Sequence, residues 1–466
     1  MKNLILGIIA LSSLSITDLV AQNKPATINC TVTGPKGSGI NLYKIKDGQA
    51  QSLGFQRPNP DGNCSFQVDE DKEGIYYFAK AGGKGADYKY VLYLKAGDTK
   101  QVNLFLGSTS VDYDSCVIQK PNKETQILQT WTTDFNQYCK VVQNRTFESH
   151  QKYADFEKKA HQFLKANHTS NTYFNSWLKD KVTTDVQYLR AANFFRFGKR
   201  LNAGYDSSAT VVDFYKPLLN KKIVSDPALL RSDHGQDLLN YVFGYWKLNQ
   251  DKAVKNLAQV PFSENIPLIT NNDVRVAYIL TKMKNITMYE DFGKQVQPYK
   301  ELFVTATQKA AYDKKYEDLY LFAKGTDGYN FKLKDVNDQE YTLAGFKGKV
   351  VVIDIWAMWC APCLAEKPVM EKIAEELKDH DDLVFVGVSV DGLNRRDNWK
   401  SFVERKGFTS IELLSNATES IHHYYKVEGI PRFLIFDRQG KIVTVDAPRP
   451  STPGFKKIIE ATLAKK

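Results

Sequence analysis

Two cysteines separated by two residues form the strongest chemical signal in the sequence. Cys360 and Cys363 flank Ala361 and Pro362, and they directly follow Trp359. A cysteine at the start of a helix meets unpaired N–H groups and the positive end of the helix dipole, which stabilise a thiolate. Two intervening residues bring the second sulfur within disulfide distance. The spacing predicts a reversible dithiol–disulfide pair, with half of a metal site or an inert disulfide as alternatives.

The residues around this pair predict a strand that leads directly into a helix. Residues 350–356 are apolar except for Asp354, a pattern typical of a central strand buried on both faces. A helical pattern follows the cysteines, and strands and helices then alternate to the end of the chain. This alternation predicts an α/β domain over residues 325–466.

The first two thirds of the chain have a different texture. Residues 24–118 contain short stretches that alternate with period two and are separated by Gly-rich turns, which predicts a small antiparallel β sandwich or barrel. Residues 122–323 carry apolar side chains at helical spacing, which predicts a helical middle domain. We therefore expect a multidomain protein with a β domain, a helical domain and an α/β domain.

The first 21 residues have the pattern of a secretory signal peptide. Lys2 precedes an apolar run over residues 4–16, which is too short to cross a bilayer, and Leu19, Val20 and Ala21 form a cleavage site. The first cysteine is Cys30, so no residue is placed for lipid attachment. We expect secretion to the periplasm or cell envelope without a lipid anchor; an uncleaved N-terminal anchor is the alternative.

Composition excludes several classes of protein. Aromatic residues make up 12% of the 466 residues, which excludes intrinsic disorder, and 28 Gly with 16 Pro are too few for a collagen-like chain. The net charge of +10 is spread along the chain without a dense basic stripe, so we expect no nucleic acid partner. No set of His and Cys residues has the spacing of a metal site.

Four further cysteines are isolated in the sequence. Cys30 and Cys64 lie on predicted strands of one sheet, so we expect them to pair, and Cys116 with Cys139 would form a second bridge. Four cysteines allow three pairings, and buried thiols are the alternative.

Residues 325–466 resemble the thioredoxin superfamily, and within it the TlpA/ResA-like envelope thiol-disulfide oxidoreductases of Bacteroidota type. The matching residues are Asp354 six residues before Cys360, the core at 359–363, Glu366 and Pro368 three and five residues after Cys363, Ile430-Pro431 at the cis-proline loop, and 436–441 at the terminal hairpin. A weaker resemblance links residues 24–118 to the β domain that precedes such modules.

The resemblance implies a role for each matching residue. Cys360 attacks a substrate disulfide and Cys363 resolves the mixed disulfide. Asp354 lies beneath the pair and exchanges a proton with Cys363, or else is a hydrogen-bonded core carboxylate.

The remaining matches would shape the site. Pro431, with Ile430, borders a substrate groove and keeps metals from the thiols, Trp359 packs beside the site and Pro362 fixes the turn. Glu366 tunes the electrostatics or is a solvated helix residue.

Two departures from the family pattern affect the site. Leu364 and Ala365 occupy positions where basic residues are common, so we expect no cation near the pair. Arg432 follows Pro431 where Thr is frequent, and it either biases the charge of the groove or faces solvent.

The sequence thus predicts a secreted oxidoreductase that exchanges the Cys360/Cys363 dithiol with disulfides of envelope proteins. Its partners would be these clients and a membrane-bound thiol electron donor, with no cofactor; its oligomeric state stays open. A disulfide isomerase and a binding or adaptor protein with a vestigial redox site are the alternatives. A peroxidase is disfavoured, because residues 357–359 lack the hydroxyl that its reactive cysteine needs.

Overall fold

The protein is represented by a computed structural model that describes residues 24–35, 38–68, 73–80, 90–107, 115–143, 148–201, 214–250, 260–415 and 420–465. The predicted signal peptide, residues 1–21, lies outside these ranges. In the described part of the chain, no helix has both the length and the apolar character needed to cross a membrane.

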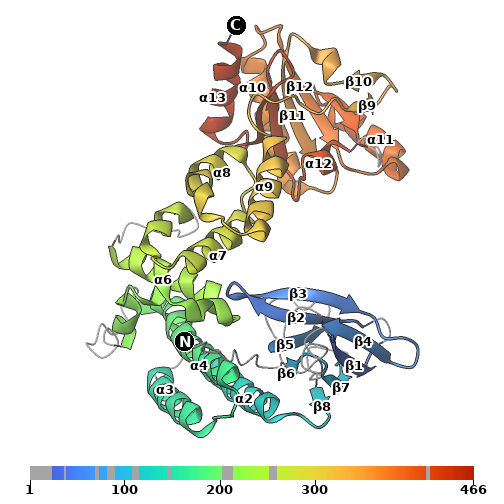
Figure 1. Ribbon diagram of the computed structural model, residues 1–466. Helices are drawn as coiled ribbons and strands as arrows, with labels where there is room; N and C mark the ends of the chain where they lie inside the picture. Colours follow the sequence, from blue (N-terminus) through green and yellow to red (C-terminus); the bar gives the residue numbers. More distant parts are fainter. Residues whose placement is uncertain are drawn as a thin grey trace, which may run out of the picture. The chain divides into compact units, whose positions relative to one another are not determined.

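The chain divides by its internal contacts into two compact units, one up to Thr281 and one from Lys282 onward. The predicted fold class is confirmed, with β sheets first, helices next and an α/β part last (Figure 1). The predicted domain limits of 24–118, 122–323 and 325–466 stay a prediction, because the two units group residues by contacts rather than by type of structure.

The first unit begins with a β sandwich. Its strands are β1 (Ala26–Thr33), β2 (Ile40–Lys46), β3 (Gln49–Gln56), β4 (Asn63–Val68), β5 (Glu73–Lys80), β6 (Tyr90–Lys95), β7 (Thr99–Phe105) and β8 (Ser115–Ile118). They form two four-stranded sheets in the orders β4-β1-β7-β8 and β3-β2-β5-β6, antiparallel except where β1 pairs with β7. Residues such as Ile28, Phe78 and Leu104 fill one core between the two sheets.

The cysteines of this unit are thiols in the structure, so the predicted disulfides are not formed. Cys30 lies directly opposite Cys64 in the β1–β4 ladder, and the pair is hydrogen-bonded rather than covalently joined. Cys116 packs on the sandwich core, whereas Cys139 packs on the core of the helical region. This separation into two cores explains why the predicted Cys116–Cys139 bridge is wrong.

Helices follow the sandwich. They are α2 (Lys123–Gln143), α3 (Glu148–Ala166), α4 (Thr172–Leu201), α6 (Gly235–Gln250) and α7 (Asn272–Met283), with short 3-10 turns η1 (Lys216–Leu219), η2 (Ile223–Ser225), η3 (Pro227–Arg231), η5 (Phe262–Glu264) and η6 (Ile266–Leu268). Tyr77 of β5 and Tyr93 of β6 share a core with Trp131 of α2 and Phe174 of α4. Strands β5 and β6 are therefore covered on both faces.

A buried charge cluster joins the helices of the first unit. The Lys181 ammonium lies 2.6 Å from Asp185 and 2.7 Å from Asp233. Asp185 also accepts hydrogen bonds from the indole of Trp131 and contacts the His234 ring. Each buried carboxylate thus has a charged or polar partner, as burial requires.

The second unit contains helices and one mixed sheet. Its elements are α8 (Tyr289–Gln295), η7 (Gln297–Leu302), α9 (Ala306–Tyr320), β9 (Lys332–Asp335), β10 (Glu340–Thr342), η8 (Ala344–Phe346), β11 (Val350–Trp356), α10 (Ala361–Glu376), β12 (Leu383–Ser389), η9 (Leu393–Arg395), α11 (Arg396–Lys406), β13 (Ile411–Leu414), α12 (Ile421–Tyr424), β14 (Arg432–Phe436), β15 (Ile442–Ala447) and α13 (Pro453–Leu463). The strand order is β10-β9-β13-β12-β11-β14-β15.

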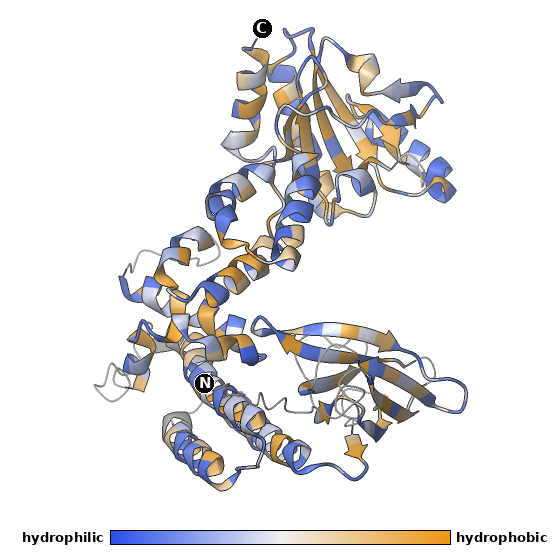
Figure 2. Ribbon diagram, viewed as in Figure 1, coloured by the Kyte–Doolittle hydropathy of each residue, from blue (hydrophilic) through white to orange (hydrophobic). Residues whose placement is uncertain are grey.

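Strand β11 lies within this sheet and is buried along its whole length. Alternate side chains point to opposite faces. Val350 and Val352 pack with α10 and α13, whereas Val351 and Ile353 pack with the core on the other face. Figure 2 shows the strands in the middle of this sheet in the colour of hydrophobic residues. This alternation places Asp354 on the face that α10 covers.

The helices before the sheet belong to the same compact unit. Phe322, which follows α9, lies in the core beneath the sheet and contacts the Tyr425 ring at 5.5 Å between centroids. Lys426 pairs with Asp318 of α9 at 3.0 Å. A fragment that begins at Gly325 would lack Phe322 and expose part of this core.

We predict that Phe322→Ala destabilises a fragment spanning residues 282–466 by about 3 kcal/mol, because it removes a ring that is 7% exposed from a packed core. Urea unfolding monitored by circular dichroism measures the change. The neighbouring Leu321→Ala is the control, because Leu321 is 54% exposed and its loss should cost less than about 0.5 kcal/mol. Equal effects of the two changes would show that Phe322 does not belong to this core.

Candidate active site

The predicted cysteine pair forms a disulfide at the start of α10. Cys360 is the N-cap residue of the helix and is joined to Cys363, in the first turn. The backbone N–H of Cys363 donates a hydrogen bond of 3.2 Å to the Cys360 sulfur, and Pro362 occupies the first turn. An unpaired helix N–H directed at sulfur stabilises negative charge there. The geometry therefore favours a thiolate at Cys360 once the disulfide is reduced.

Asp354 is buried on the β11 face covered by α10. Its Oδ2 lies 3.5 Å from the Lys367 ammonium, and among the described residues its Oδ1 has no hydrogen-bond partner. Burial raises the pKa of Asp354 to about 7, the nearby Lys367 charge opposes this rise, and the Glu412 charge adds to it. A carboxyl group of this kind exchanges a proton near neutral pH.

Sequence reasoning missed two charged residues of this site, Lys367 and Glu412. The Lys367 ammonium from α10 lies 2.5 Å from a Glu412 oxygen of β13 and stacks over the Trp356 ring at 4.4 Å. The Trp356 indole and the Ser410 hydroxyl also donate hydrogen bonds to Glu412. Although Leu364 and Ala365 bring no charge, the same helix thus contributes one buried cation, Lys367.

One glycine makes room for this arrangement. Gly387 of β12 pairs with Asp354 on one side and with Glu412 on the other, so the three residues form one row across the sheet. A Cβ atom at Gly387 would lie 2.2 Å from the Glu412 carboxylate. The absent side chain thus provides the space in which the Glu412 carboxylate lies.

The other predicted site residues surround the disulfide. Ile430 packs against the cluster that contains both cysteines, and the Ile430–Pro431 peptide bond is cis. Trp359 is 65% exposed, so its ring faces solvent beside Cys360. Arg432 forms an ion pair with Asp446 at 2.7 Å.

Glu366 is buried rather than solvated. Its carboxylate accepts hydrogen bonds of 2.9 Å from both the backbone N–H and the hydroxyl of Ser451, in the segment before α13. Its charge adds to the rise in the pKa of Asp354. The predicted electrostatic influence on the site is thus consistent with where Glu366 lies.

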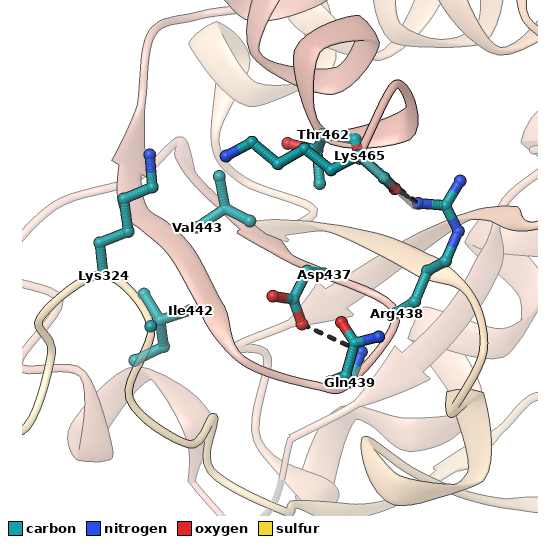
Figure 3. A pocket seen from close by; sticks show the side chains of 9 residues that line it. Lys324, Asp437, Arg438, Gln439, Ile442, Val443, Thr462 and Lys465 are labelled. Carbon is teal, nitrogen blue, oxygen red and sulfur yellow. Dashed lines mark hydrogen bonds between the residues drawn. The ribbon is translucent and has the colours of Figure 1, made fainter.

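A separate pocket of about 260 Å³ lies beside the β14–β15 turn and the end of α13 (Figure 3). Arg438 at its rim donates hydrogen bonds to the carbonyls of Leu463 and Lys465. None of the residues that line it belongs to the cysteine site.

Comparison with known proteins agrees with this geometry. A family model described as AhpC/TSA family matches residues 325–445. The thioredoxin-like protein YneN of Bacillus subtilis is 30% identical over 120 residues, which are 26% of this chain and 68% of that protein. The chain belongs to the thioredoxin superfamily.

Other proteins similar to this region are named thiol-disulfide oxidoreductases. The thiol-disulfide oxidoreductase ResA of Geobacillus thermodenitrificans is 28% identical over 144 residues, 31% of this chain and 72% of that protein. A solved thioredoxin domain of a thiol-disulfide oxidoreductase from Bacteroides vulgatus is 26% identical, with a TM-score of 0.27, and covers 30% of this chain and 98% of that one. The region from residue 325 onward is that of a thiol-disulfide oxidoreductase with a thioredoxin-like fold, and it is similar to ResA.

We predict that Asp354→Asn stabilises the oxidised thioredoxin-like unit at alkaline pH. The folded-state pKa of about 7 exceeds the ordinary value of about 3.9, so the wild type loses stability as the pH rises through this window. The advantage of the variant should therefore grow by about 4 kcal/mol between pH 4 and pH 8. Urea unfolding of residues 282–466 at both pH values measures it.

The exposed Asp381 provides the matched control, since Asp381→Asn makes the same chemical change outside the core. Its effect should be small and the same at both pH values. A constant difference between wild type and Asp354→Asn across this pH range would contradict the assignment of a raised pKa.

Proposed function

We propose that the protein is a secreted oxidoreductase that exchanges its Cys360/Cys363 dithiol with disulfides of cell-envelope proteins. The single observation that supports this best is the Cys360–Cys363 disulfide at the N-terminus of α10, where a backbone N–H is directed at the Cys360 sulfur. The secretion step rests on the signal-peptide pattern of residues 1–21. The reducing equivalents would come from a membrane-bound thiol donor.

The proposed reaction has two exchange steps. The Cys360 thiolate attacks one sulfur of the client disulfide, forming a mixed disulfide and releasing the other client sulfur as a thiolate. Cys363 loses its proton and attacks the Cys360 sulfur, which releases the second client thiol. The Cys360–Cys363 disulfide forms, and the client gains two electrons. The donor thiols restore the dithiol by the reverse exchange.

Asp354 would accept the proton of Cys363 in the second step. Its carboxyl lies beneath α10, and its pKa of about 7 allows the deprotonated form to be present at neutral pH. The role fits the second step rather than the first, because the Cys360 thiolate has its own stabilisation from the helix N-terminus.

Client contacts would form around the exposed ring of Trp359 and the Ile430–Pro431 loop. An exposed aromatic ring beside the attacking sulfur provides an apolar contact, and the backbone beside Pro431 would pair with an extended client segment. Glu366 and Pro362 would support the site from the helix by fixing its charge and its first turn.

The experiment that tests this proposal separates the two cysteines. In the full chain, Cys363→Ser should accumulate mixed disulfides with envelope proteins or reduced insulin chains, because the second step is blocked. Cys360→Ser should abolish insulin reduction and trap nothing. Non-reducing gels with mass spectrometry detect the adducts. Insulin reduction by Cys360→Ser would contradict the assignment of the attacking sulfur.

Asp354→Asn should slow the second step by roughly tenfold or more at pH 7 and leave the first step within about twofold. An aromatic disulfide reagent that releases one coloured thiolate in each step lets stopped-flow absorbance follow both rates. Asp381→Asn is the control. Equal second-step rates for Asp354→Asn and wild type from pH 6 to pH 9 would refute the proton role of Asp354.

A further inference from the structure

Three charged side chains are buried together under α10, and their charges do not cancel. Asp354, Lys367 and Glu412 bring two carboxyl groups and one ammonium group, and each residue is almost fully buried. If all three were ionised, one negative charge would remain in a low-dielectric interior. Such a cluster is most stable when one carboxyl group keeps its proton.

The contacts decide which carboxyl group keeps the proton. Glu412 accepts hydrogen bonds from the Lys367 ammonium at 2.5 Å, the Ser410 hydroxyl at 2.7 Å and the Trp356 indole at 2.8 Å. Three donors favour a carboxylate at Glu412. Asp354 has only the longer contact of 3.5 Å to Lys367, and its Oδ1 accepts no hydrogen bond among the described residues.

The Lys367 ammonium is held in place on several sides. It lies over the rings of Trp356 and Phe408, with centroids at 4.4 Å and 4.6 Å, in addition to its contact with Glu412. These contacts hold the ammonium closer to Glu412 than to Asp354, from which it lies 3.5 Å away. The charge of Lys367 therefore stabilises the Asp354 carboxylate less than it stabilises Glu412.

We propose that Lys367 and Glu412 are positioning residues that keep Asp354 as the one carboxyl group of the site able to exchange a proton near neutral pH. This inference rests on the proton role of Asp354 proposed above. It assigns different roles to the two carboxyl groups. Glu412 binds the Lys367 cation, and Asp354 exchanges the proton.

The charged groups that act on Asp354 come from two elements. Helix α10 contributes Glu366 and Lys367, and β13 contributes Glu412. The residues that pair with Asp354 in the sheet, Gly387 of β12 and Phe433 of β14, add no charge. Glu366 is bound to Ser451 and keeps its partners when Lys367 or Glu412 is changed. The two positioning residues can therefore be tested separately from the rest.

Changes at the two positions should move the pH dependence in opposite directions. Glu412→Gln removes the competing carboxylate, so Lys367 pairs with Asp354 and the pH midpoint of the second exchange step falls by about one unit or more. Lys367→Met removes the cation, so the midpoint rises by about one unit or more. The pH midpoint of the double variant should lie between those of the two single variants. A merely structural role would lower the rates without opposite displacements.

Matched controls come from an exposed ion pair at the end of the same helix. Glu375 and Lys378 form a contact of 2.6 Å with both side chains in solvent. Glu375→Gln and Lys378→Met change the net charge of the full chain by the same amounts and should leave the midpoint unchanged. If Lys367→Met fails to fold, as judged by circular dichroism, Lys367→Gln takes its place.

Infrared difference spectra of the full chain against Asp354→Asn separate the two claims. A protonated-carboxyl band that titrates between pH 5 and 9 and shifts oppositely in Glu412→Gln and Lys367→Met supports the inference. If the band titrates in both variants at the same pH as in the wild type, the inference is overturned but the proposed function stays intact. A band that does not titrate in wild type overturns both.

Discussion

Burying more carboxyl groups than ammonium groups around the active-site helix is the constraint on which the structure of this site depends. The Lys367 ammonium can fully neutralise one carboxylate, and it pairs with Glu412. The Trp356 indole and the Ser410 hydroxyl donate two further hydrogen bonds to Glu412. The second carboxyl group, Asp354, is buried without such a partner. Burial disfavours its charged form and raises its pKa to about 7. The helix that begins at the reactive disulfide thus covers a group that can give or take a proton under the conditions in which thiols exchange.

The surrounding fold fixes this constraint in place. Period-two alternation directs Asp354 toward α10, and the absence of a side chain at Gly387 leaves room for Glu412 of the neighbouring strand β13. Helix α10 presents Cys363 and Lys367 four residues apart, which places them on the same face. The sheet, the helix and the glycine therefore act together, because a shift of one residue in the register of β11 or β13 would turn Asp354 or Glu412 to the opposite face.

The sequence predicts the fold of the α/β part and its cysteine pair, whereas the buried charges around Asp354 depend on tertiary packing. The cysteine spacing and the buried strand before it predicted the fold of the last part and put Asp354 on that strand. Lys367 was missed because a lysine in a helix usually reaches solvent, although its spacing from Cys363 was a signal. Glu412 gave only one sign, a carboxylate within a short apolar strand. Phe322 could not be assigned to the last core, because membership depends on tertiary packing that local patterns do not encode.

The reduction potential of the Cys360/Cys363 couple as a function of pH tests the central claim most directly, in the wild type and in Asp354→Asn. If the Asp354 proton is coupled to the thiols, reduction changes its pKa, and the wild-type curve departs from a straight line near pH 7. The variant curve should lose this bend and keep only the bends that come from the thiols of Cys360 and Cys363. Superimposable curves for the two proteins from pH 5 to pH 9 would contradict the account, because Asp354 would then take no part in the proton balance of the exchange.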